Sequence, residues 1–190
     1  MINSELSHDK IKLYLGLDVS TSVTGICLID DNAKILEIDR IEFKGCDDLW
    51  QKADKVKDEL QKISKKYSGD FCVALEEPLL GFQKGMSSAA TITTLMRFNG
   101  IVSYISRDVF GINPVYIGSA HARKLCGIKM QRTAVAGLSG KEQVFKYMSE
   151  NDLKDINWPK KKNGKEVDWS RDATDAYVIA KASFLSREHN

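Results

Sequence analysis

Four acidic residues stand where their side chains could act together on one substrate. Asp18 follows the apolar stretch "LYLGL", and Glu76 closes a second apolar stretch, "DFCVALE". Asp172 and Asp175 are three residues apart in "RDATDAYVIA", so on a helix their side chains point the same way. A buried carboxylate without a partner is costly, and a cluster of carboxylates repels itself. Such a group therefore needs bound cations or raised pKa values.

The chemistry expected of such a cluster is metal-dependent cleavage of a phosphodiester. Ligand sets made of oxygen atoms suit Mg²⁺ or Mn²⁺. Two such ions about 4 Å apart activate a water and stabilise the leaving oxygen. The prediction is therefore two Mg²⁺ (or Mn²⁺) ions per active site.

The segment "GLDVSTS" alone also allows a different interpretation. It fits a phosphate-binding turn of the kind found in actin-like and sugar-kinase-like ATPases. Such an enzyme needs a second lobe with its own glycine-rich phosphate loop, and we find neither in a chain of 190 residues. No nucleotide cofactor is expected.

The elements that must position the acids follow from hydrophobic periodicity. Strands are predicted at 12–18, 23–30 and 34–43, then at 70–77 and 112–118, and helices at 87–109, 119–126, 141–150 and 170–187. A further amphipathic helix joins the third and fourth strands, and its predicted buried stripe consists of Leu49, Trp50, Ala53, Val56, Leu60 and Ile63. The fourth strand should run parallel to the first. This order predicts an α/β chain with a ribonuclease H-like fold, a five-stranded mixed sheet flanked by helices, in a single domain (1–190) after a flexible N-terminus (1–10).

Small residues accompany the acids on the predicted strands. Gly16 shares a strand face with Asp18, and Ala74 shares one with Glu76, which favours Glu76 over the oppositely directed Glu77. A face lined by small side chains lets another element approach closely. The last helix offers a matching small face, formed by Ala173, Ala176 and Ala180.

Basic residues are concentrated locally, although the net charge of +2 indicates no particular partner. No Asp or Glu occurs from residue 109 to residue 141. The candidate DNA-contacting residues in this stretch are Arg123, Lys124, Lys129, Arg132 and Lys141. The polar loop 157–170 adds further lysines that suit a phosphate backbone, and its Trp158 and Trp169 are expected to pin it to the domain.

Sequence features also bear on location. No apolar run approaches the length of a membrane span, and "MINSELSHDK" lacks the apolar core of a signal peptide. The four cysteines show no metal-binding spacing and are expected to stay reduced. A cytoplasmic protein with no membrane partner is expected.

Four segments together resemble the signature regions of the RuvC family of Holliday junction resolvases: "LGLDVSTSVTGICLID", "VALEEPL", "SGKEQVFKYM" and "RDATDAYVIA". The resemblance extends over residues 12 to 185. It implies that Asp18, Glu76, Asp172 and Asp175 are the metal-binding and catalytic acids. It further implies two basic residues beside the scissile phosphate, Lys124 and the catalytic Lys141, and an aromatic residue inserted near the crossover, for which Phe82 in "EPLLGFQKG" is the candidate.

The same resemblance implies an activity and an assembly. The expected activity is resolution of four-way DNA junctions by paired symmetric nicks, which needs two equivalent sites and therefore a C2 homodimer. The helix at 87–109 is the expected contributor to its interface. The apparent insertion "KKKNGKEVDW" suggests a phage- or organelle-type relative, placed in a host cytoplasm or an organelle. Two alternatives stay open: a broader nuclease for forks and flaps, and a non-catalytic nucleic-acid-binding module of the same fold.

Overall fold

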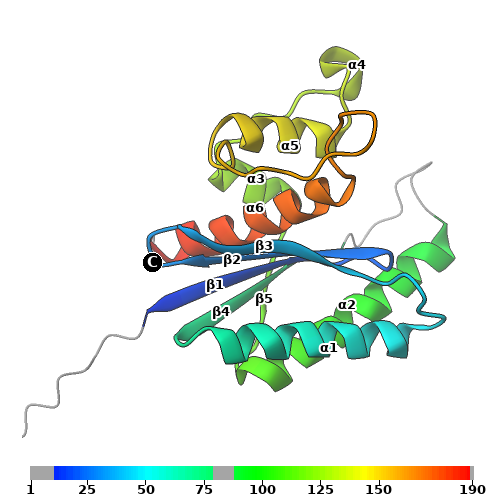
Figure 1. Cartoon of the computed structure of the whole chain (residues 1–190), viewed down its shortest axis with the longest axis vertical. Helices are drawn as coiled ribbons and strands as arrows, with labels where there is room; N and C mark the ends of the chain where they lie inside the picture. Colours follow the sequence, from blue (N-terminus) through cyan, green and yellow to red (C-terminus); the bar gives the residue numbers. More distant parts are fainter. Residues whose placement is uncertain (1–10, 79–87, 189–190) are drawn as a thin grey trace, which may run out of the picture.

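The computed structural model describes residues 11–78 and 88–188, and these residues form a mixed five-stranded sheet (Figure 1). The strand order is β3-β2-β1-β4-β5, and the strands are β1 (Lys12–Asp18), β2 (Val23–Asp30), β3 (Ile35–Glu42), β4 (Asp70–Glu76) and β5 (Val115–Ile117). β2 runs antiparallel to β1 and β3, whereas β4 runs parallel to β1 and β5. The predicted fold class is confirmed.

Helices cover both faces of this sheet. They are α1 (Leu49–Lys66), α2 (Ala89–Phe110), α3 (Ser119–Leu125), α4 (Thr133–Ala136), α5 (Gly140–Glu150) and α6 (Trp169–Glu188). α1 and α2 lie on one face, while α6 crosses the other with α3, α4 and α5 beyond it (Figure 1). Alternate residues of β1 serve the two sides: Leu15 and Leu17 pack toward α1 and α2, and Tyr14 packs toward α6.

α1 buries a regular stripe, with one correction to the sequence prediction. Ala53, Val56, Leu60 and Ile63 are buried as predicted. Trp50, predicted to belong to the same stripe, is 70% exposed. Leu49, which was also predicted, packs against the core because it continues the alternating spacing of four and three, whereas Trp50 lies about 100° further round the helix.

α6 packs backbone to backbone against the sheet, as the small residues predicted. A Cβ added at Gly16 would collide with the carbonyl oxygen of Ala176, and one added at Gly25 would collide with that of Asp172. Ala173, Ala176 and Ala180 are fully buried in this contact. Because Gly16 and Gly25 have no side chain, the first turns of α6 can lie beside the end of β1.

The region between β5 and α6 departs in detail from the prediction. β5 is shorter than the predicted 112–118, and the short helix α4 was not predicted at all. The loop 157–170 contains a small hairpin, closed by an antiparallel bridge between Lys160 and Glu166. Within the two described ranges, the longest helices carry too many polar side chains to cross a membrane.

Candidate active site

Three aspartates surround the ammonium group of Lys141. Its Nζ lies 3.1 Å from Oδ2 of Asp18, 2.6 Å from Oδ1 of Asp172 and 3.3 Å from Oδ2 of Asp175. The aspartate side chains are largely buried, whereas that of Lys141 is half-exposed at 50%. Residues from β1, α5 and α6 thus meet at one point, with a cation at its centre and an opening to solvent.

Local structure explains why these side chains converge. Ser139 caps α5 by accepting a hydrogen bond from the Glu142 backbone N–H, which places Lys141 in the first turn. Arg171 on α6 pairs with Glu142 on α5 through Nε–Oε1 at 3.1 Å. This ion pair fixes the starts of α5 and α6 beside each other, so that Lys141 faces the aspartates of α6.

Glu76 lies at the edge of the same cluster. The parallel register of β1 and β4 pairs Gly16 with Ala74 and ends both strands at an acid. Burial raises the pKa of Glu76, and the negative charge of Asp18 raises it further. Arg123, a hydrogen bond from Ser119, and Lys141 act in the opposite direction and lower it.

The cluster holds more negative charge than its lysine offsets. Burial raises the pKa of Asp175 to about 7, and the charges of Asp18 and Glu76 add to the rise, against the lowering effect of Lys141. Burial also raises the pKa of Asp18, again partly offset by Lys141. Burial lowers the pKa of Lys141, but the surrounding aspartates more than compensate, so its net pKa is raised. Additional positive charge would therefore stabilise the ionised cluster.

The donor set fits a hard divalent cation. In the described ranges, no three His, Cys, Asp or Glu side chains are arranged around one metal position, and the aspartate oxygens are directed at Lys141 Nζ instead. The available donors are nevertheless all carboxylate oxygens, and they converge from two strands and one helix. Burial raises the pKa values of Asp18, Glu76 and Asp175, and neighbouring negative charges raise them further. Mg²⁺ and Mn²⁺ are the cations that such oxygen donors suit.

The basic residues predicted to contact DNA divide into separate groups. Arg123 is half-buried, and its charge acts on Asp18 and Glu76. Lys124 is exposed and lies outside the carboxylate cluster. Arg123, Lys124 and Lys129 line a shallow cavity of 540 Å³ beside α3. Arg132 is exposed at the start of α4, and Phe82 lies outside the described residues.

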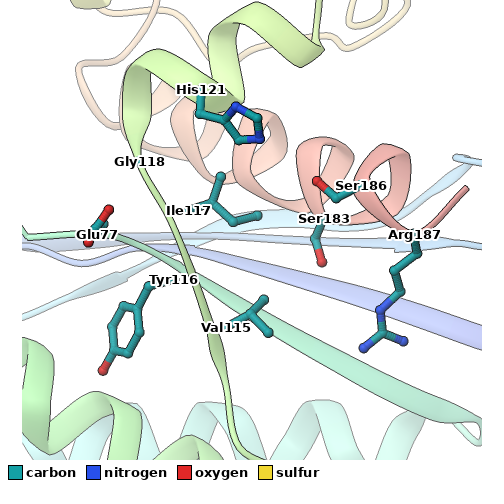
Figure 2. Close-up of a pocket in the computed structure, with 9 residues that line it drawn as sticks. All are labelled: Glu77, Val115, Tyr116, Ile117, Gly118, His121, Ser183, Ser186 and Arg187. Carbon is teal, nitrogen blue, oxygen red and sulfur yellow. The ribbon is translucent and has the colours of Figure 1, made fainter. Parts of the chain in front are cut away.

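Glu77, the rival of Glu76, lies on a different surface. It lines a cavity of 570 Å³ at the β5 edge, together with His121, Ser183 and Arg187 (Figure 2). Figure 2 shows His121 reaching into this cavity from α3 and Arg187 approaching from the end of α6. The aspartates that surround Lys141 do not line this cavity, so the two neighbouring glutamates serve different environments.

Several residues support the acids in a role that the sequence did not predict, including Arg123, which was predicted only to contact DNA. Ser119 and Arg123 both act on Glu76, and they are four residues apart on α3. That spacing places them on one helix face, a signal that favours Arg123 over Lys124 as the neighbour of the acids. The pair formed by Arg171 and Glu142 joins two segments 29 residues apart, and no local spacing predicts it.

Three solved structures that share this fold are described as RuvC or as a Holliday junction resolvase. RuvC of Thermus thermophilus in complex with a Holliday junction substrate matches with a TM-score of 0.62 and 13% identity, covering 93% of this chain and 96% of that one. A second structure of Thermus thermophilus RuvC matches with a TM-score of 0.57 and 15% identity, and the coverage of the two chains is the same. The yeast mitochondrial Holliday junction resolvase Ydc2 matches with a TM-score of 0.55 and 13% identity, covering 92% of this chain and 78% of that one. No protein-family model and no curated protein sequence matches the chain.

Proposed function

We propose that this chain, which has the fold of the RuvC-type resolvases, is a metal-dependent endonuclease that resolves four-way DNA junctions. The observation that carries the proposal is the convergence of Asp18, Asp172 and Asp175 on Lys141, with Glu76 at the same strand ends. A fold that only bound DNA would have no use for a buried, self-repelling group of acids. The fold comparison, which spans nearly the whole chain, supports the proposal at the level of architecture.

Each residue of the cluster has a distinct part in this proposal. Asp18, Glu76, Asp172 and Asp175 would hold two Mg²⁺ or Mn²⁺ ions, which supply an activated water and stabilise the leaving oxygen. Lys141 is half-exposed and presents a positive charge to a phosphate entering from solvent. Arg123 adds charge on the side of Glu76. The close packing of α6 on Gly16 and Gly25 holds the acids in register.

Paired nicking adds a requirement for assembly. One chain supplies one set of acids, and a four-way junction presents two equivalent strands related by a two-fold axis. A C2 homodimer places one site on each strand, and we assign part of its interface to α2.

Two other functions differ from this one in what they predict. A broader branched-DNA nuclease would cut forks and flaps as fast as four-way junctions. A non-catalytic module would bind junctions and leave them intact. The actin-like interpretation of "GLDVSTS" is disfavoured because Asp18 faces a lysine and two further acids in a fold shared with nucleases.

The test is cleavage of a synthetic four-way junction with each strand end-labelled in turn, in Mg²⁺ and in EDTA. We expect nicks at symmetric positions on two opposing strands, in Mg²⁺ only. A linear duplex of one arm's sequence is the control and should stay intact. Absence of cleavage, or equal cutting of the linear duplex, contradicts the proposal; equal cutting of a fork would favour the broader nuclease.

A further inference from the structure

A lysine-rich hairpin stands directly before α6, the helix that carries Asp172 and Asp175. The backbone N–H of Lys161 donates to the carbonyl of Lys165 at 2.7 Å, and that of Val167 donates to the carbonyl of Pro159 at 3.0 Å. Gly164 adopts the left-handed conformation needed at the turn, with φ of 79°. These bonds give the segment a defined shape in place of an open loop.

The base of the hairpin is anchored by aromatic packing, as Trp158 and Trp169 predicted. Trp158 is buried, with ring centroids 6.0 Å from Phe145 and 5.9 Å from Trp169. The guanidinium of Arg40 lies 4.1 Å from the ring centre of Trp169. Arg171 stacks on Phe145 at the same distance. Elements from β3, α5 and α6 therefore hold the hairpin in place.

Three of the four lysines in the hairpin, Lys160, Lys162 and Lys165, have no ion-pair partner among the described residues. Lys161 is paired with Asp168, and Glu166 lies 3.9 Å from Arg171. Lys160, Lys162 and Lys165 are exposed, and their side chains have no hydrogen bond or ion pair with the residues at 11–78 and 88–188. Three of the four hairpin lysines thus present positive charge that pairs with no acidic side chain in the described residues.

The position of the hairpin relates this surface to the carboxylates. Trp169 is four positions after Lys165 in the sequence, and Asp172 is three helical positions after Trp169. The Cα atoms of Lys165 and Asp172 are therefore at most about 19 Å apart. Successive phosphates of one DNA strand rise about 3.4 Å along the duplex axis, so this distance corresponds to at most about six nucleotides. The segment also lies on the same side of the sheet as α3 and α5, which carry Arg123 and Lys141 (Figure 1).

We propose that this hairpin, residues 157–168, is a docking surface for the phosphate backbone of the duplex arm that carries the scissile phosphate. The inference rests on the proposed function and adds a binding element to it. Anchoring is the decisive feature: a lysine-rich loop that served only solubility would gain nothing from being held. A fixed loop, in contrast, loses less conformational freedom when it binds, which strengthens phosphate contact.

The test compares two triple variants with the same change in charge. In the first, Lys160, Lys162 and Lys165 are each replaced by Gln. In the control, the replacements are at Lys12, Lys34 and Lys65, exposed lysines at the opposite end of the sheet from Asp18. Fluorescence anisotropy with a labelled four-way junction is recorded in EDTA across a range of salt concentrations, with circular dichroism as the check on folding.

We expect the hairpin variant to bind at least tenfold more weakly than the parent at low salt. We also expect its plot of log affinity against log salt to be shallower by about 2 to 3, since each lost phosphate contact removes about 0.9 from the slope. In the control variant, the slope of log affinity against log salt should decrease by less than half as much as in the hairpin variant. Equal losses in the two variants, or none in the hairpin variant, overturn the inference. A parent that neither prefers nor cuts a four-way junction overturns the proposed function instead.

Discussion

At the scale of single residues, Lys141 lies at the centre of the aspartate cluster. Its ammonium neutralises part of the charge of three aspartates, and its side chain remains half-exposed toward solvent. The same group is therefore placed both to stabilise the cluster and to meet an incoming phosphate. These two roles make different predictions.

Replacing Lys141 by Ala should slow cleavage of a four-way junction much more than it weakens binding. Charge on the scissile phosphate grows in the transition state, so the loss of one positioned cation costs roughly 10²- to 10³-fold in rate. Binding in EDTA should change by less than about threefold. Single-turnover cleavage and anisotropy measure the two effects, and equal losses in both would make Lys141 an ordinary docking contact.

Lys129→Ala and Arg132→Ala serve as the comparison for this variant. Both residues are exposed and lie away from the aspartates. Each variant should weaken binding and reduce the salt slope by about 1, as the loss of one phosphate contact does. Cleavage at saturating protein should stay near the parental rate. A cleavage defect as large as that of Lys141→Ala would place these residues in the active site.

The raised pKa of Asp175 predicts how the stability of the metal-free protein depends on pH. Its pKa in the folded state, about 7, lies above the unfolded value of 3.8, so the folded state holds the proton more tightly. The contribution of the protonated Asp175 to the free energy of unfolding is complete below about pH 4 and is lost as the pH rises through 7. In EDTA, Asp175→Asn should therefore raise the free energy of unfolding at pH 8 by on the order of 1 to 3 kcal/mol, with little change at pH 4. Urea unfolding measures this; a variant less stable than the parent at pH 8 contradicts it.

At the scale of elements, periodicity and residue size predicted most of what positions the acids. The five strands and the five longer helices follow from apolar spacing, and the closeness of α6 follows from Gly16 and the alanines of the helix. α4 escaped prediction because four residues carry no period. Trp50 was misplaced because it neighbours Leu49, which already occupies the buried position. The pair of Arg171 with Glu142 depends on how α5 and α6 pack together, which local patterns do not contain, whereas the spacing of Ser119 and Arg123 on α3 does carry a signal.

The packing of α6 can be tested at Gly25, where a Cβ would collide with the backbone of Asp172. Gly25→Ala should lower the free energy of unfolding by about 1 to 3 kcal/mol and displace the acids of α6, with a loss of cleavage in the protein that still folds. Gly100→Ala is the matched control, since Gly100 is exposed on α2 and an added Cβ there meets nothing within 4 Å. It should stabilise by about 0.5 to 1 kcal/mol. An innocuous Gly25→Ala would show that contact between α6 and β2 does not position the site.

At the scale of the whole molecule, paired cleavage requires two copies of the chain. Tyr104 on α2 and Trp50 on α1 are aromatic side chains of nearly equal exposure, 69% and 70%, on two different helices. If α2 contributes to the interface, Tyr104→Glu should shift the protein toward monomer in sedimentation, and Trp50→Glu should not. The first variant should also uncouple the two nicks in a junction. A parent that stays monomeric with and without junction DNA contradicts the dimer.

The acids around Lys141 are proposed to form a metal-dependent cleavage centre. The most direct measurement compares Asp18→Asn and Asp175→Asn with the parent, by cleavage of a four-way junction in Mg²⁺ and by junction affinity in EDTA. Each variant keeps the size of the side chain and removes one negative charge from a site that a phosphate must approach. Cleavage should collapse in both, while binding without metal stays the same or becomes tighter. A variant that still cuts at near the parental rate, or two folded variants that no longer bind the junction, would contradict the account.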